Sequence, residues 1–129
     1  MAGKVDISAL NTPPEQYEFE TAKYFAASGK DIVFICPSSI PNHHRPDIVM
    51  DGIEWEIKCP VGNSKRTIEN NMRKALKQSH YVIFDLRHLK MSEKQAISQL
   101  EKEFERTSSL RKLYIIKKNG DLLVYPPKD

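Results

Sequence analysis

The chain has 129 residues, of which 40% are hydrophobic and 29% charged, and its net charge is +3 at pH 7. These values are ordinary for a soluble globular protein, and the length indicates one domain. No apolar run approaches the roughly 18 residues of a membrane span, and the N-terminus lacks the apolar core of a signal peptide, so neither segment is expected.

The first residues are polar and end in a pair of prolines. We expect residues 1–14 to be a flexible lead-in and residues 15–129 to be a single domain. A helix is predicted over 14–28, because its larger side chains recur in part at helical spacing and a glycine follows. On this helix Glu20 is the first candidate for an added metal or water ligand and Glu18 the second; the alternative is that both are solvent-exposed.

A short buried strand is predicted over 31–36, followed by a loop over 37–46 that is rich in turn formers. The loop carries His43 and His44. One of these side chains could act as a general acid for the leaving oxygen or donate to a phosphate. The alternative is a pair of exposed loop histidines.

Two cysteines, Cys36 and Cys59, fall at the ends of predicted strands. Free thiols in a reducing compartment are the expected state. A disulfide between them, or a zinc site shared with His43 and His44, is left as an alternative.

A β-hairpin is predicted over 47–58, because the pair Asp51-Gly52 suits a tight turn. Its second strand, 53–58, alternates strictly, so its residues point in turn to opposite faces of the sheet. The core side would receive Ile53, Trp55 and Ile57, with core packing preferred over base stacking for the tryptophan. The opposite side would receive Glu54, Glu56 and Lys58.

In that hairpin Asp47 lies at the end opposite the turn, where Glu56 and Lys58 approach it from the neighbouring strand. Two carboxylates and one ammonium at a common edge are suited to holding Mg²⁺ or Mn²⁺ against a phosphodiester. The cation would lower the pKa of a bound water, and the lysine would orient or activate that water. The alternative is a surface hairpin with an ordinary Glu–Lys pair.

Basic residues follow this strand closely. Between positions 58 and 90 there are eight Lys or Arg residues and two acids. A helix is predicted over 66–79, and its polar face would carry Arg66, Asn70, Arg73 and Lys77 at helical spacing. Such a face suits contacts with backbone phosphates, and a solvated helix face is the alternative.

Further along, a buried strand is predicted over 81–86 and an amphipathic helix over 92–107, with Ser92 as its cap. A second hairpin is predicted over 113–125, around Asn119-Gly120. The order of elements is then α-β-β-β-α-β-α-β-β, which predicts an α/β (α+β) fold with a mixed β-sheet flanked by helices.

The order of a helix Glu, Pro46-Asp47 and Glu56-x-Lys58 resembles the PD-(D/E)xK nuclease superfamily, whose restriction-endonuclease-like core has the elements α-β-β-β-α-β. Within residues 15–90, three segments are more closely similar to the C-terminal toxin domains of contact-dependent growth-inhibition (CdiA-type) proteins. These segments are Glu20 to Gly29, Arg45-Pro-Asp-Ile to Trp55-Glu-Ile-Lys-Cys-Pro, and Ser64 to Lys77-Gln78 with Val82 to Leu86.

This resemblance implies a tRNA-cleaving toxin that depends on Mg²⁺, Mn²⁺ or Zn²⁺, acts in the cytoplasm of a bacterial target cell and is neutralised by a cognate immunity protein. It carries Glu20, Asp47, Glu56 and Lys58 over as the catalytic set. Three alternatives stay open: a DNA endonuclease or DNA-processing enzyme of the same fold, a metal-independent RNase toxin, and a non-catalytic nucleic-acid-binding module.

Overall fold

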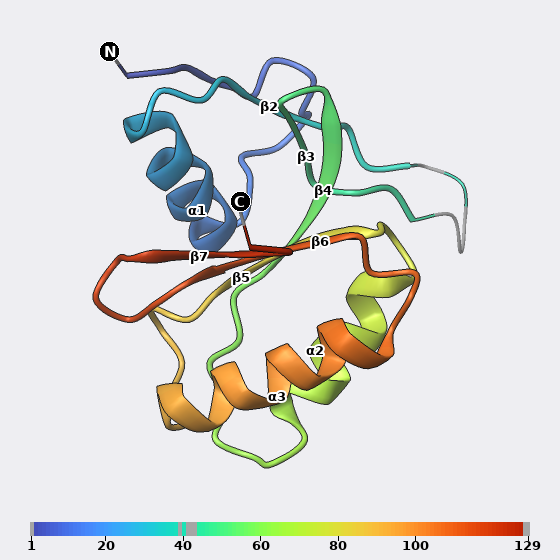
Figure 1. The fold of residues 1–129 in the computed structure, drawn as a ribbon. Helices are drawn as coiled ribbons and strands as arrows, with labels where there is room; N and C mark the ends of the chain where they lie inside the picture. Colours follow the sequence, from blue (N-terminus) through green and yellow to red (C-terminus); the bar gives the residue numbers. More distant parts are fainter. Residues whose placement is uncertain (1, 39, 41–43, 128–129) are drawn as a thin grey trace.

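The computed structural model describes residues 2–38, 40 and 44–127 and contains one mixed sheet with helices on both faces (Figure 1). The mixed α/β architecture is as predicted, and the predicted elements occur in the predicted order. One further strand, β1, lies in the lead-in segment. The elements are β1 (Val5–Asp6), α1 (Gln16–Ala27), β2 (Ile32–Phe34), β3 (Ile48–Met50), β4 (Ile53–Lys58), α2 (Thr67–Leu76), β5 (Tyr81–Asp85), α3 (Glu93–Arg106), β6 (Lys112–Ile116) and β7 (Leu122–Tyr125).

The strands lie in the sheet in the same order as in the chain. Antiparallel pairs join β2 to β3, β3 to β4 and β6 to β7, whereas β1 runs parallel to β2, and β4, β5 and β6 run parallel to one another. The two parallel connections from β4 to β5 and from β5 to β6 contain α2 and α3, as parallel crossovers require. The sheet therefore has β4 near its centre.

The predicted β3–β4 hairpin is present, with Met50 opposite Ile53. Its two turn residues have positive φ, 56° at Asp51 and 74° at Gly52. Both angles suit the two-residue turn that matches the twist of the flanking strands. This turn places Asp47 across from Glu56 at the far end of the hairpin.

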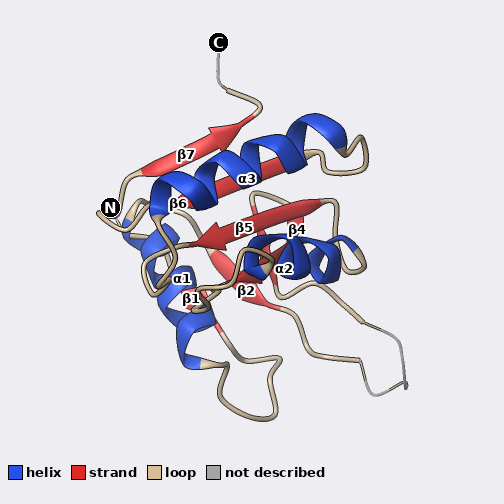
Figure 2. Cartoon of the chain, turned by 90° about the horizontal axis from the view of Figure 1, so that it is seen from below, coloured by secondary structure: helices blue, strands red, loops and turns tan. Residues whose placement is uncertain are grey.

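The hydrophobic core is divided by the sheet into two layers, with α1 on one face and α2 and α3 on the other (Figures 1 and 2). Trp55 belongs to the α1 layer, 1% exposed and with its ring centroid 4.5 Å from that of Tyr114. Packing in the core, rather than an exposed stacking surface, is thus the role the structure gives this ring. None of the helices in the described residues combines the length and apolar character needed to cross a bilayer.

The lead-in segment contacts the rest of the fold. The backbone N–H of Gly3 donates to the carbonyl oxygen of Ala26 (2.7 Å), and β1 pairs with β2. A Cβ at position 3 would lie 1.9 Å from the carbonyl oxygen of Lys30, so only glycine allows this close approach. The segment before α1 is therefore held against the edge of the sheet.

Candidate active site

The end of the β3–β4 hairpin brings Asp47, Glu56 and Lys58 together. Asp47 accepts a hydrogen bond through Oδ2 from the backbone N–H of Ile57 (2.8 Å), which fixes its carboxylate beside β4. Lys58 Nζ lies 3.3 Å from Glu56 Oε2. The convergence of these three side chains, expected from their spacing, is therefore present.

The two carboxyl groups lie across the hairpin from each other, Glu56 buried and Asp47 half-buried. Glu56 is 3% exposed, because the face of β4 that carries it is the face on which α2 packs. Burial, followed by the charge of Asp47, raises the pKa of Glu56 to about 9. Burial also raises the pKa of Asp47, although the hydrogen bond from the backbone N–H of Ile57 opposes this increase. The pair thus requires a proton or a cation to offset its negative charge.

Gln78, just beyond the end of α2, contacts this pair. With its amide oriented to donate, the side-chain nitrogen lies 3.0 Å from each carboxylate oxygen of Glu56 and 3.2 Å from the carbonyl oxygen of Arg45. One side chain therefore ties the glutamate to the segment that leads into Asp47.

From α1 it is Glu18, rather than Glu20, that interacts with the hairpin. Burial raises the pKa of Glu18 to about 8, the charge of Asp47 adds to the increase, and Lys58 opposes it. Glu20 instead places Oε1 3.5 Å from Nε2 of His88. The helix α1 thus docks with position 18 toward the carboxylates, and the roles of Glu18 and Glu20 as ligands stay predictions.

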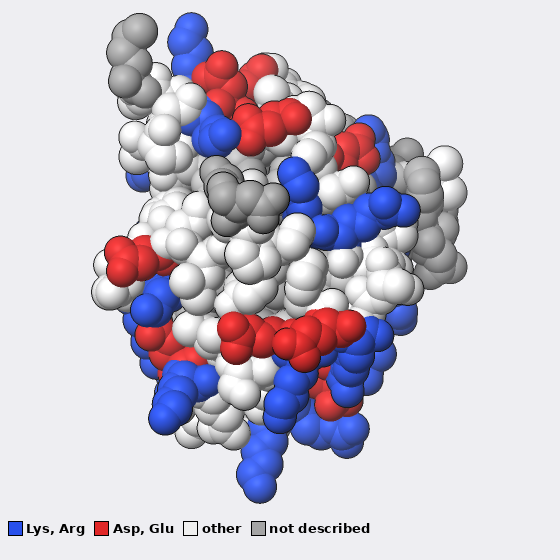
Figure 3. Space-filling view, viewed as in Figure 1, with Lys and Arg blue, Asp and Glu red and all other residues white. Residues whose placement is uncertain are grey.

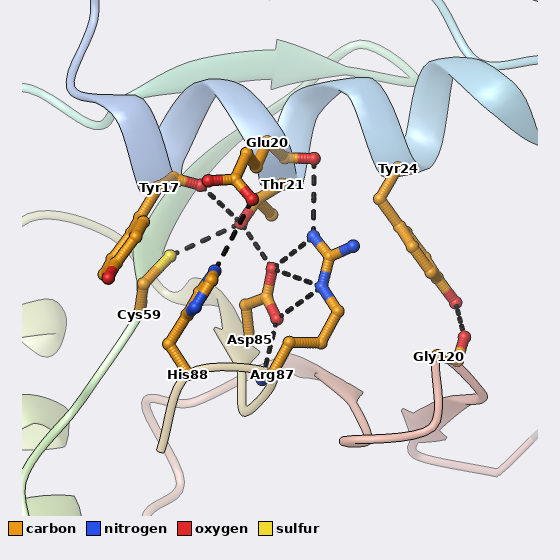
Figure 4. Close-up of polar contacts among 9 residues, drawn as sticks. All are labelled: Tyr17, Glu20, Thr21, Tyr24, Cys59, Asp85, Arg87, His88 and Gly120. Atoms are coloured by element: carbon orange, nitrogen blue, oxygen red, sulfur yellow. Dashed lines mark hydrogen bonds and ion pairs between the residues drawn. The ribbon is translucent and has the colours of Figure 1, made fainter. Parts of the chain in front are cut away.

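A polar network that the sequence did not predict lies next to this site (Figure 4). Thr21 on α1 donates through its hydroxyl to Oδ2 of Asp85 (2.7 Å) and lies 3.3 Å from Sγ of Cys59. Arg87 donates to both carboxylate oxygens of Asp85 and to the carbonyl oxygen of Glu20 (3.4 Å). Burial alone would raise the pKa of Asp85, but the hydrogen bonds from Arg87 and Thr21 outweigh it and lower that pKa. The network thus holds α1 to the end of β5.

Beside the network, the rings of Tyr17 and His88 stack with centroids 3.9 Å apart and planes 5° apart. His88 therefore joins the α1 side of this region through both Tyr17 and Glu20. The network around Asp85 had one signal in the sequence. Asp85 stands at the end of an apolar run, and Arg87, two residues later, could form an ion pair with it.

The carboxylate oxygens of Asp47 and Glu56 could supply some of the ligands of a hard cation such as Mg²⁺. No group of three or more His, Cys, Asp or Glu side chains arranged to hold a metal occurs among the described residues. Magnesium, however, is commonly held by only one or two carboxylates, with waters and substrate phosphates completing its shell. Asp47 and Glu56 are compatible with that smaller set.

Both cysteines are free thiols and half-buried. Burial raises the pKa of Cys59 to about 12, which disfavours the thiolate that zinc requires. His43 lies outside the described residues. His44 is exposed and lines a cavity of about 220 Å³ together with Arg45, Asp47 and Gln78. The suggested roles of the two histidines stay predictions.

The predicted polar face of α2 is exposed at Arg66, Arg73 and Lys77, with Asn70 partly buried. Arg66 contacts Glu69 (3.3 Å), and Arg73 donates to Oδ1 of Asn70 (2.9 Å). Figure 3 shows Lys and Arg side chains gathered over the lower part of the molecule, where α2 and α3 lie, below a band of acidic residues. The basic surface is thus mixed with acidic residues, and phosphate binding by α2 stays a prediction.

A family model described as the contact-dependent growth inhibition CdiA C-terminal domain matches residues 44–122, which is more than half of the chain. Among solved structures, the chain is similar to one from a CdiA-CT/CdiI toxin and immunity complex of Burkholderia pseudomallei. The TM-score is 0.68 at 18% sequence identity, over 97% of this chain and 100% of that one, so the likeness shows a shared fold. No significant match was found among the curated proteins.

Proposed function

Since the chain belongs to the CdiA C-terminal domain family of contact-dependent growth inhibition, a family of interbacterial toxins, we propose that it acts as a divalent-metal-dependent endonuclease of the PD-(D/E)xK type. The proposed substrate is tRNA, because the toxin domains that residues 15–90 resemble mostly cleave tRNA. Its proposed place of action is the cytoplasm of the target cell, after delivery.

One observation carries this proposal: Asp47 lies across the hairpin from Glu56, fixed by hydrogen bonds to the backbone of β4, and the Lys58 ammonium lies 3.3 Å from Glu56 Oε2. Asp47 and Glu56 would hold Mg²⁺, Mn²⁺ or Zn²⁺. When bound, such a cation would neutralise phosphate charge and lower the pKa of a coordinated water.

The protein side chains then have distinct roles. Lys58 is half-buried beside Glu56, so its three N–H donors can hold the attacking water or a phosphate oxygen at the carboxylates. Gln78 orients Glu56 through its amide. Glu18, rather than Glu20, is the helix residue that supports Asp47 and Lys58. The phosphate backbone would be contacted by residues on α2 and at its two ends, Arg66, Asn70, Arg73 and Lys77.

We further propose a cognate immunity protein as a partner. The solved structure that shares this fold comes from a toxin and immunity complex. A nuclease that acts on the RNA of its own cell needs such an inhibitor before delivery. Co-expression with the protein encoded next to this chain would test this partner.

The function is tested by incubating purified protein with total tRNA and, separately, with plasmid DNA, in Mg²⁺, Mn²⁺, Zn²⁺ or EDTA. Discrete tRNA fragments that disappear in EDTA are expected. Fragments that persist in EDTA would remove the metal role of Asp47 and Glu56. Cutting of plasmid alone would assign the chain to DNA, and no cleavage of either would favour a binding module.

A further inference from the structure

A cavity of about 360 Å³ opens beside the candidate active site, between the segment that precedes α1 and the end of β2. Its apolar walls include Leu10, Phe34 and Ile35. At one end it is bordered by the carboxyl groups of Glu18 and Asp47. We refer to this cavity, lined by residues of 10–18, 34–37 and Asp47, as the base pocket.

The base pocket is continuous with the backbone that positions Asp47. The N–H of Ile35, on the pocket wall, donates to the carbonyl oxygen of Asp47 (2.9 Å). Asp47 also borders the 220 Å³ cavity that Gln78 lines on its other side. A ligand in the base pocket would thus lie directly against the carboxylate proposed to work on the phosphodiester.

Size and chemistry limit what this pocket can hold. Pockets for small organic groups run from roughly 300 to 1,000 Å³ and combine apolar walls with a few polar atoms, so this one is at the small end. Its polar lining includes the acidic side chains Glu15, Glu18 and Asp47 and no Lys or Arg. The pocket therefore offers a phosphate no cationic partner, whereas it can accept a flat apolar group with N–H donors.

We propose that the base pocket binds one nucleobase of the substrate, unstacked from its neighbours, and prefers a base with an exocyclic amino group. This inference rests on the proposed function, since the base would belong to a nucleotide beside the cleaved phosphate. A pocket for a single base accepts a nucleotide that is already unpaired, as in the loops and ends of RNA, more readily than one that must first be extruded from a duplex. The pocket therefore favours a substrate with an unpaired base at the cut site.

The preference for a base with an exocyclic amino group follows from the hydrogen-bond acceptors of the pocket. The carboxyl oxygens of Glu15, on the pocket wall, can accept hydrogen bonds from the amino group of cytosine or adenine. Uracil presents a carbonyl oxygen where cytosine presents that amino group. This carbonyl oxygen would face a carboxyl oxygen of the pocket, and two acceptors form no hydrogen bond. Inosine differs from adenosine in the same way. Glu15 is the exposed member of the acidic set and the one most open to substitution.

The test uses the full chain carrying Lys58→Ala, titrated with cytidine, uridine, adenosine and inosine and followed by the backbone amide NMR signals of residues 10–18 and 34–37. Cytidine or adenosine should shift these signals, and its partner lacking the amino group should bind about tenfold more weakly, the ratio expected for about one hydrogen bond. Glu15→Gln should bring that ratio close to one. The control Glu105→Gln, an exposed glutamate on α3, should leave it unchanged.

The outcomes separate this inference from the proposed function. Absence of shifts at the pocket with all four nucleosides, or equal binding of the two members of each pair, would overturn the base pocket even if tRNA is cleaved. Selective binding of cytidine or adenosine, with the ratio brought close to one by Glu15→Gln, would support it even if no cleavage is found. In that second case the nuclease assignment would fail and the pocket would stand.

Discussion

Thr21 donates a 2.7 Å hydrogen bond through its hydroxyl to Oδ2 of Asp85, and so links α1 to the end of β5. Both residues are buried, and the same hydroxyl lies 3.3 Å from Sγ of Cys59, the residue that follows Lys58. The helix that carries Glu18 is therefore held to the strand ends that border the candidate active site.

Thr21→Val should destabilise the protein by about 1–3 kcal/mol, because the substitution keeps the shape but removes a donor to a buried carboxylate. Urea unfolding at pH 7, monitored by circular dichroism, measures this change in the free energy of unfolding. Thr12→Val, at an exposed position, is the matched control and should stay within about 0.5 kcal/mol of the parent. Equal stability of the two variants would show that the link is dispensable.

The pH dependence of stability should include a contribution from Asp85. The folded-state pKa of this carboxyl is lowered from its ordinary value of 3.8. Its ionised form therefore stabilises the folded protein above about pH 4, and that contribution disappears as the pH falls through the folded-state pKa. Asp85→Asn should lower the free energy of unfolding at pH 7 and flatten the curve below pH 4. An unchanged slope in acid would exclude Asp85 as a source of acid sensitivity.

The two glutamates on α1 should differ in their effect on cleavage. Glu18→Gln should reduce the rate on tRNA roughly tenfold or more, because it removes a group that interacts with Asp47 and Lys58. Glu20→Gln should leave the rate within about twofold, since its carboxylate pairs with His88. Initial rates with the same tRNA preparation make the comparison, and the reverse result would restore Glu20 as the catalytic residue.

Gln78→Leu should weaken cleavage and the binding of Mn²⁺ by about 10- to 100-fold, the range found when a partner that orients a metal ligand is removed. The amide that donates to Glu56 and to the carbonyl oxygen of Arg45 would be lost. Isothermal titration with Mn²⁺ gives the affinity independently of cleavage. Gln95→Leu, exposed on α3, serves as the control, and identical affinities for both variants would remove Gln78 from the site.

Lys58→Ala and Asp47→Ala should each abolish cleavage while preserving the fold. Lys58 lies outside both hydrophobic core clusters, so its truncation removes no apolar side chain from the core. Circular dichroism and the thermal midpoint check the fold, and a fluorescent tRNA substrate checks the activity. Full activity in either variant would exclude that residue from the mechanism.

Much of the fold could be predicted because its signals are local. The strict alternation over 53–58 and the Asp51-Gly52 turn predicted the hairpin, and the cap at Ser92, whose hydroxyl accepts from the backbone N–H of Gln95 (3.4 Å), marked the start of α3. Strand β1 had no such signal. It spans two residues, too few for a pattern, and forms only because β2 offers an edge.

The candidate active site likewise has a part that local sequence signals predicted and a part that they did not. Asp47, Glu56 and Lys58 lie on one hairpin, so their approach to one another follows from strand periodicity and turn length, and both can be read from local sequence. Positions 18 and 20 of a helix point about 200° apart, and only the docking of α1 on the sheet decided which of them reaches the carboxylates. Burial of Glu56 by α2, its contact with Gln78, and the link from Thr21 to Asp85 likewise required the tertiary structure, because each joins residues far apart in the chain whose meeting depends on how both faces of the sheet are covered.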